Sequence, residues 1–90
     1  MTRLTLRVPR ILAPFCEGET SLPVSGNDVR TALADAMTRH PMLRRHLLDE
    51  EGRVREHLHL FLNETDVRNE LDAATRDGDE LYVLQAMSGG

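Results

Sequence analysis

The C-terminus of this chain carries a group that could do chemistry, the carboxylate of Gly90, which follows Ser88 and Gly89. Glycine has no Cβ atom, so two terminal glycines adopt backbone angles that other residues avoid and can enter a narrow channel. A carboxylate on so slim a segment suits transfer into the active site of another protein. The alternatives are the remnant of a linker and a terminal segment with no function.

Two other residue types that often carry chemistry give weaker signals. His57 and His59 are two residues apart in an alternating segment, so their rings share a face, but only Glu56 adjoins them and we expect no metal site. Cys16 is the only cysteine, which excludes an internal disulfide. No basic or helix-start neighbour would activate its thiol, so we expect a small apolar core residue.

The composition limits the class of protein. Ninety residues make one small domain with a single core, and the formal charge of −4 argues against a general nucleic-acid binder. No stretch approaches the length of a membrane span, and the N-terminus carries no signal peptide, so we expect a cytoplasmic protein. There is no glycine-rich phosphate loop and no legible catalytic triad. We therefore expect no catalytic residues and no bound cofactor.

The first half of the chain predicts two strands and a helix. Residues 2–8 alternate between apolar and polar side chains, which is typical of a half-buried strand. Prolines then indicate a loop over residues 9–18, and Pro23 places a second strand, residues 20–24, at a sheet edge. Capping residues 25–28 precede apolar residues at helical spacing, which predict the main helix. Pro41 can begin a second, shorter helix.

The second half predicts more strands. Residues 57–63 alternate again, with three leucines inward and Phe61 outward. A short strand near residues 67–68 and a single helical turn at residues 71–75 follow. Residues 77–79 predict a tight turn before a last strand with Leu81 and Val83 on one side. One long helix on a mixed sheet is an α+β fold. We expect a domain of residues 1–86 and a flexible tail of residues 87–90.

This order and this ending resemble the MoaD/ThiS family of ubiquitin-like sulfur carrier proteins, most of all its CysO-like and MoaD-like members. Residues 60–68, Leu-Phe-Leu-Asn-Glu-Thr-Asp-Val-Arg, are similar to the family's hydrophobic strand followed by Asn-x-x-Asp-Val-Arg. Residues 77–81, Asp-Gly-Asp-Glu-Leu, are similar to the turn that enters its last strand, and Gly89-Gly90 follows at the usual distance. Residues 9–12 look like the start of CysO-type carriers. Residues 84–86, Leu-Gln-Ala, depart from the Phe-Pro-Pro segment common in MoaD proteins.

The resemblance implies a ubiquitin-like β-grasp fold, with a mixed four- to five-stranded sheet, one main helix and a short second helix. It implies a sulfur carrier whose Gly90 carboxylate is adenylated and converted to a thiocarboxylate that donates sulfur. The implied partners are an ATP-dependent, ubiquitin-activating-type adenylating or sulfurtransferase enzyme and a sulfur-accepting synthase. The chain is then a co-substrate, and the partner uses the ATP. Cysteine, molybdopterin and a specialised metabolite stay open as the product.

Two further questions stay open at this stage. Phe61 faces outward by its strand position, so Phe61 and, in the tail, Met87 are candidate docking residues; the alternative is that loops or the second helix cover Phe61. A ubiquitin-like protein modifier and a non-catalytic β-grasp interaction module are the alternative functions. All eleven basic residues are arginine. The chain therefore cannot form lysine-linked polymers of itself, which disfavours a ubiquitin-style polymer.

Overall fold

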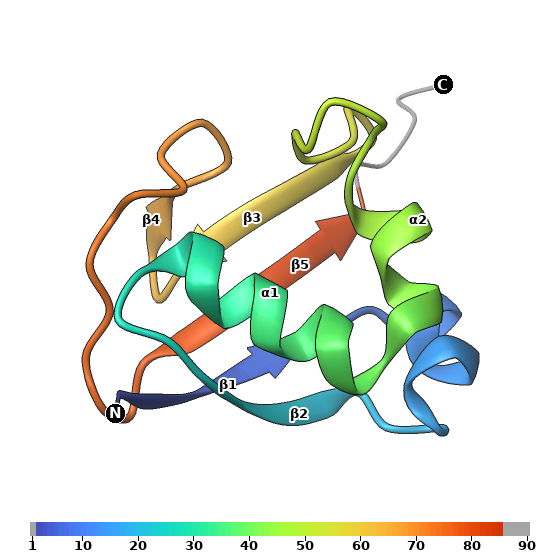
Figure 1. Cartoon of the computed structure of the whole chain (residues 1–90), viewed down its shortest axis with the longest axis horizontal. Helices are drawn as coiled ribbons and strands as arrows, with labels where there is room; N and C mark the ends of the chain where they lie inside the picture. The colour runs from blue at the N-terminus through green and yellow to red at the C-terminus, as the bar shows by residue number, and fades with distance from the viewer. Residues whose placement is uncertain (1, 86–90) are drawn as a thin grey trace.

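The fold is an α+β arrangement built on one five-stranded mixed sheet. The computed structural model describes residues 2–85; the predicted tail, residues 87–90, lies outside them. The sheet has the order β2-β1-β5-β3-β4, and α1 packs across one face (Figure 1). In chain order the elements are β1 (Arg3–Arg7), the 3₁₀ helix η1 (Arg10–Cys16), β2 (Ser21–Ser25), α1 (Val29–Arg39), the 3₁₀ helix η2 (Pro41–Leu43), α2 (Arg44–Leu47), β3 (Leu58–Leu62), β4 (Thr65–Asp66) and β5 (Glu80–Gln85). The predicted α+β fold is confirmed.

Strand β5 lies at the centre of the sheet. It pairs parallel to β1 over residues 80–82, and antiparallel to β3 from Leu62↔Leu81 to Leu58↔Gln85. Leu81 and Val83 are 0% and 3% exposed, so the predicted inward side of this strand is confirmed. Neighbouring strands thus pair with the first half of β5 on both sides, and β3 alone pairs with residues 83–85. This strand leads directly to the tail.

Helix α1 begins and packs as the sequence predicts. The Asp28 carboxylate caps it by accepting a hydrogen bond of 2.7 Å from the Thr31 N–H. One side of the helix, including Val29, Ala32 and Ala36, is fully buried against the sheet. Pro41 begins η2, which continues into α2, so the predicted short second helix is also confirmed.

The predicted loop over residues 9–18 is wrong, because this segment forms η1. Leu12, Ala13 and Cys16 are buried in the core. The three-residue spacing from Ala13 to Cys16 suits a 3₁₀ helix, whose side chains repeat every three residues. Pro9 and Pro14 are typical of irregular chain, but a proline can also stand in a helix where no backbone donor is needed.

Two predictions between β3 and β5 are also wrong. The short strand expected near residues 67–68 occurs earlier, as β4, because Val67 enters the core at 1% exposure. The helical turn expected at residues 71–75 is replaced by turns and an isolated bridge of Ala74 to Asp28. Carbonyls of this segment accept hydrogen bonds from the first N–H groups of α1, at 3.0 Å and 2.8 Å. These donors have no partner within a helix, so the segment satisfies them instead.

Gly26, which precedes α1, contacts both this segment and the backbone of the helix. Thr75 is buried, and its hydroxyl donates a hydrogen bond to the Gly26 carbonyl. A Cβ atom added at Gly26 would lie 2.8 Å from the Cα of Ala32 and closer still to its backbone nitrogen. The clash would be with backbone atoms, so no side-chain movement could relieve it. Only glycine therefore allows residue 26 to lie this close to the backbone of α1.

We predict that Gly26→Ala lowers the free energy of unfolding by about 3 kcal/mol, because the new methyl group overpacks rigid backbone. The matched control is Gly52→Ala, where the Cβ meets nothing within 4 Å and only the positive φ of 81° is strained. We expect the control to lose about 1 kcal/mol. Urea unfolding measures both. A loss at Gly26 no larger than the loss at Gly52 would contradict the packing argument.

Candidate functional site

Strand β5, at the centre of the sheet, ends just before the predicted tail. Gln85 ends β5 beside Leu58 of β3. The predicted working residues Gly90, Gly89 and Ser88, and the docking candidate Met87, lie outside the described residues. Any protein that holds Gly90 must therefore come close to the surfaces around Gln85.

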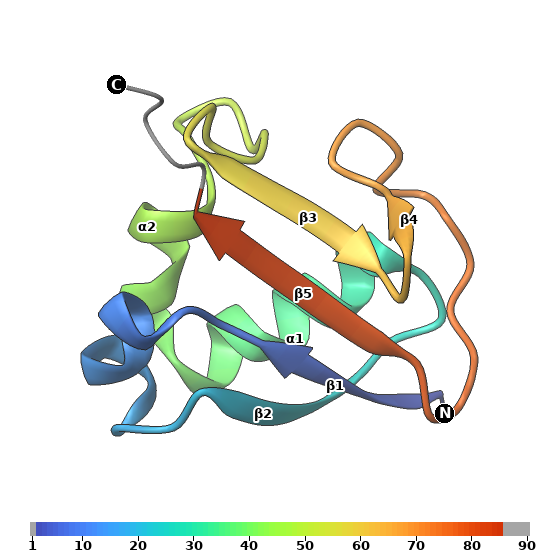
Figure 2. The same ribbon diagram turned by 180° about the vertical axis from the view of Figure 1, so that it is seen from behind.

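The first of these surfaces is the sheet face opposite α1. Figure 2 shows this face in front, with the described helices behind the strands or at their end. Phe61 lies opposite Tyr82, and His59 lies opposite Leu84. We call these four residues the open face. Leu84 is 48% exposed, and Phe61 and Tyr82 are half-buried.

The predicted outward orientation of Phe61 is confirmed, since it stands on the face that α1 does not cover. Its role in docking stays a prediction. The sequence analysis missed its neighbours Tyr82 and Leu84 as members of the same patch. Their alternation placed them on one side of β5, but only the register of β5 against β3 brings them beside Phe61.

A polar chain fixes the position of Tyr82 on this face. The Arg7 Nε donates a hydrogen bond of 2.6 Å to Glu80 Oε1, and the Tyr82 hydroxyl donates one of 2.9 Å to Glu80 Oε2. The hydrogen bonds from Arg7 and Tyr82 lower the pKa of the Glu80 carboxyl. The same contact with Glu80 raises the pKa of Tyr82. Exposed ion pairs contribute little stability, so the main effect is to orient these side chains.

Other residues with possible chemistry have ordinary positions. Cys16 is 0% exposed, and burial raises the pKa of its thiol, so the predicted core role is confirmed. His57 and His59 are exposed. Within residues 2–85, no three His, Cys, Asp or Glu side chains are placed to hold a metal ion. None of the helices in this part of the chain is long and apolar enough to cross a membrane.

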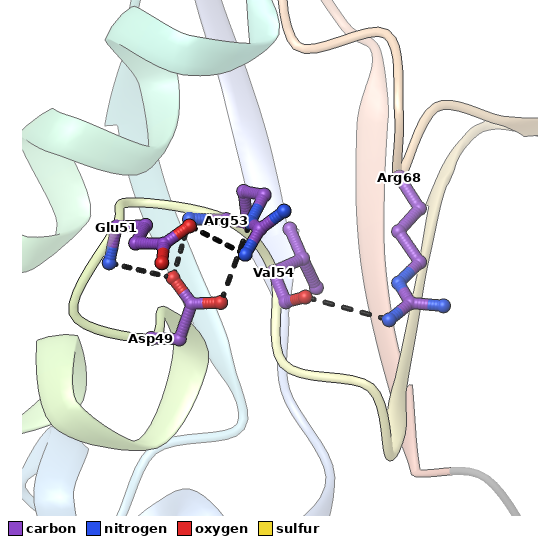
Figure 3. A network of polar contacts seen from close by, with 5 residues as sticks. All are labelled: Asp49, Glu51, Arg53, Val54 and Arg68. Carbon is purple, nitrogen blue, oxygen red and sulfur yellow. Dashed lines mark hydrogen bonds and ion pairs between the residues drawn. The ribbon is translucent and has the colours of Figure 1, made fainter.

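The loop between α2 and β3 is held by a polar network that the sequence analysis missed (Figure 3). Asp49 accepts hydrogen bonds from the backbone N–H groups of Glu51 and Arg53, at 2.8 Å and 3.0 Å. Both hydrogen bonds lower the pKa of the Asp49 carboxyl, and the bond from Arg53 has the larger effect. Arg68 donates to the Val54 carbonyl at 3.5 Å. An aspartate side chain that accepts a hydrogen bond from the backbone N–H two residues later is typical of a turn.

Comparisons with known proteins agree with this architecture. Residues 8–90 match the model of the ThiS family. The chain is 29% identical over 91 residues to the sulfur carrier protein CysO of Mycobacterium tuberculosis, covering 97% of this chain and 98% of that protein. A chain of the crystal structure of the Amycolatopsis orientalis BexX/CysO complex is 32% identical, with a TM-score of 0.85 over 97% of this chain and 99% of that one. SAMP1 of Haloferax volcanii is 26% identical, with a TM-score of 0.82 over 98% and 99%.

The sheet order, the helix across one face and these structural similarities define a ubiquitin-like β-grasp protein. The match over residues 8–90 reaches the terminal glycine. The chain belongs to the ThiS family. The resemblance to sulfur carriers that the sequence indicated is therefore confirmed.

We predict that Arg7→Gln raises the pKa of Glu80 toward its ordinary value of 4.5, because the largest cause of its lowering is removed. In the wild type, the contribution of Glu80 to stability is present above about pH 4.5 and is lost as the pH falls through the lower, folded-state pKa. Carboxyl NMR titration measures the shift. Arg3→Gln, on the same strand, is the control and leaves the Glu80 pKa unchanged. An unchanged pKa of Glu80 in Arg7→Gln would contradict the assignment.

Proposed function

We propose that the chain is a sulfur carrier protein, whose Gly90 carboxylate is adenylated by a partner enzyme and converted to a thiocarboxylate that donates sulfur in a biosynthetic reaction. The observation that carries this proposal is the family match, which includes the terminal Gly89-Gly90. The similarity to CysO over nearly the full length of both chains supports it.

The chemistry explains why the carboxylate needs a partner. A carboxylate is a poor electrophile because its negative charge is delocalised. Its oxygen attacks the α-phosphorus of ATP, pyrophosphate leaves, and the product is an acyl adenylate. A sulfur donor then attacks the acyl carbon and AMP leaves, which forms the thiocarboxylate. ATP is bound by the partner, and the carrier binds no cofactor of its own.

The folded domain acts as a handle for this carboxylate and not as a catalyst. The partners supply the catalytic groups, while the domain is bound and the terminal group is delivered to the reaction centre. Holding two reactants together in this way replaces an encounter in solution with a reaction inside one complex. The tethered sulfur is also transferred without release of free sulfide.

Membership of the ThiS family implies partner enzymes that take part in sulfur transfer. A crystal structure of the Amycolatopsis CysO contains it in complex with BexX. We assign two partners to this chain: a ubiquitin-activating-type adenylating enzyme and a sulfur-accepting synthase. The similarity to CysO, and residues 84–86 in place of Phe-Pro-Pro, favour cysteine or a specialised metabolite as the product over molybdopterin. The cytoplasm, where ATP is available, is the compartment we propose.

The open face is the docking surface that we propose for these partners. Phe61, Tyr82 and Leu84 form an apolar strip beside the C-terminal half of β5. Apolar and aromatic side chains of this kind are enriched in the cores of protein interfaces. A partner that binds the strip is correctly placed to take the tail.

We predict that the full chain, incubated with ATP, a sulfide source and an adenylating enzyme of the ubiquitin-activating type from the same organism, gains the mass difference between one sulfur and one oxygen. Removal of Gly90 abolishes the gain, because the activated carboxylate is displaced from its position. Intact-protein mass spectrometry measures both. An unmodified wild-type chain, or equal loading without Gly90, would overturn the proposed function.

A ubiquitin-like modifier is the second candidate, favoured by the similarity to the small archaeal modifier protein SAMP1. The same experiment separates the two functions when cell extract is added. A covalent adduct of a second protein with the Gly90 carbonyl indicates a modifier, whereas a thiocarboxylate alone indicates a carrier.

We predict that Leu84→Ser raises the KM for the carrier in the adenylation reaction several-fold and leaves kcat unchanged, since it removes apolar contact made equally before and during the reaction. Pyrophosphate-exchange kinetics measure the two constants. Met42→Ser is the matched control, because Met42 is similarly exposed, at 53% against 48%, but lies in η2 and not on the open face. Equal KM values for the two variants would remove the open face from the interface.

A further inference from the structure

A groove of about 470 Å³ lies at the same end of β5, and its lining shares no residue with the open face. Its walls come from η1, α2 and the segment before β3, and Gln85 forms part of its rim. Figures 1 and 2 both show η1 and α2 together beside the C-terminal end of β5. The last described residue of the chain therefore lies at the edge of this groove.

The groove combines an apolar part with a basic part. Ile11 is 61% exposed, the highest value among the exposed large apolar side chains of the described residues. The ring of Phe15 stacks on His46 at 3.9 Å. Arg45 and Arg55 stand at the same groove, whose lining within residues 2–85 includes no aspartate or glutamate. This lining contrasts with a chain of 15 acidic and 11 basic residues. Asp49 and Glu50 line an adjoining hollow that the two arginines share.

The basic part is held in place by backbone contacts. Arg55 Nε donates a hydrogen bond of 2.7 Å to the Arg45 carbonyl, and the Arg55 N–H donates one of 3.0 Å to the Leu47 carbonyl. These contacts join the loop to α2, and the Asp49–Arg53 network of Figure 3 closes the loop itself. Within residues 2–85, the guanidinium of Arg45 makes no ion pair, so its charge is available to a ligand.

The length of the tail decides which molecule can reach this groove. Residues 86–90 span at most roughly 18 Å. A protein that encloses Gly90 in its active site therefore has its surface within that distance of Gln85, and Gln85 lines the groove. The enzyme that activates the tail is thus brought against the groove whenever it acts.

We propose that this groove receives an acidic loop of the enzyme that adenylates Gly90, with a carboxylate of the loop on Arg45 and Arg55 and an apolar side chain against Ile11 and Phe15. The inference rests on the proposed function, since it concerns the same tail. The open face and the groove then form two separate contacts near Gln85. The charge pair orients the carrier, and the apolar contact holds it.

The test uses the full chain and the adenylating enzyme that loads it in the mass-spectrometric experiment. We expect Arg45→Glu to raise the KM for the carrier roughly tenfold at low salt with kcat unchanged, because it places like charges together. Added KCl brings the KM of Arg45→Glu closer to the KM of the wild type, since salt screens exposed charges. Ile11→Ser raises KM several-fold, and this rise does not depend on salt.

The matched control is Arg44→Glu, which makes the same charge change one residue earlier in α2, outside the groove lining. Circular dichroism and urea unfolding confirm that both variants fold. Equal KM values for Arg45→Glu and Arg44→Glu, with normal loading of the wild type, overturn this inference alone. The groove would then serve the sulfur acceptor or a second copy of the chain. Failure of the wild type to load overturns the proposed function, and this inference with it.

Discussion

The pairing of β5 with β1 on one side and β3 on the other is the interaction on which the rest of the structure depends. Strands β1 and β5 come from opposite ends of the chain. Their parallel pairing therefore brings together residues that nearly the whole sequence separates. Leu6 and Leu81 stand side by side in this pairing and are both fully buried. The strand that leads to the terminus is therefore anchored in the core at its start, and its last residue, Gln85, is held by pairing with Leu58 of β3.

This constraint gives a small protein a function without a catalytic site of its own. The domain needs only to present a carboxylate and to be recognised around the strand that carries it. Both candidate surfaces lie at that strand: Tyr82 and Leu84 belong to β5, and Gln85 lines the groove. Two contacts that differ in character, one apolar and one partly basic, allow the domain to be bound in a single orientation, because each has its own complement on the partner.

Much of this fold could be predicted because local patterns and tertiary structure agree. Alternation in β1, β3 and β5 and the apolar stripe of α1 follow directly from which side chains are buried. The predictions that were wrong concern segments whose conformation is set by tertiary contacts. Residues 71–75 are shaped by unpaired donors at the start of α1, and η1 by burial under the sheet end. The outward position of Phe61 was readable from the sequence. The groove was not, because Ile11, Arg45 and Gln85 are far apart in the chain.

Delivery of the terminal carboxylate to the activating enzyme is the role that we propose for the folded domain. The most direct measurement compares kcat/KM for adenylation of the full chain with that of a synthetic peptide of residues 86–90, which has the same carboxylate and no domain. We predict that the value for the peptide is lower by roughly 100-fold or more, because binding of the domain is lost. Equal values for the peptide and the full chain would contradict the account.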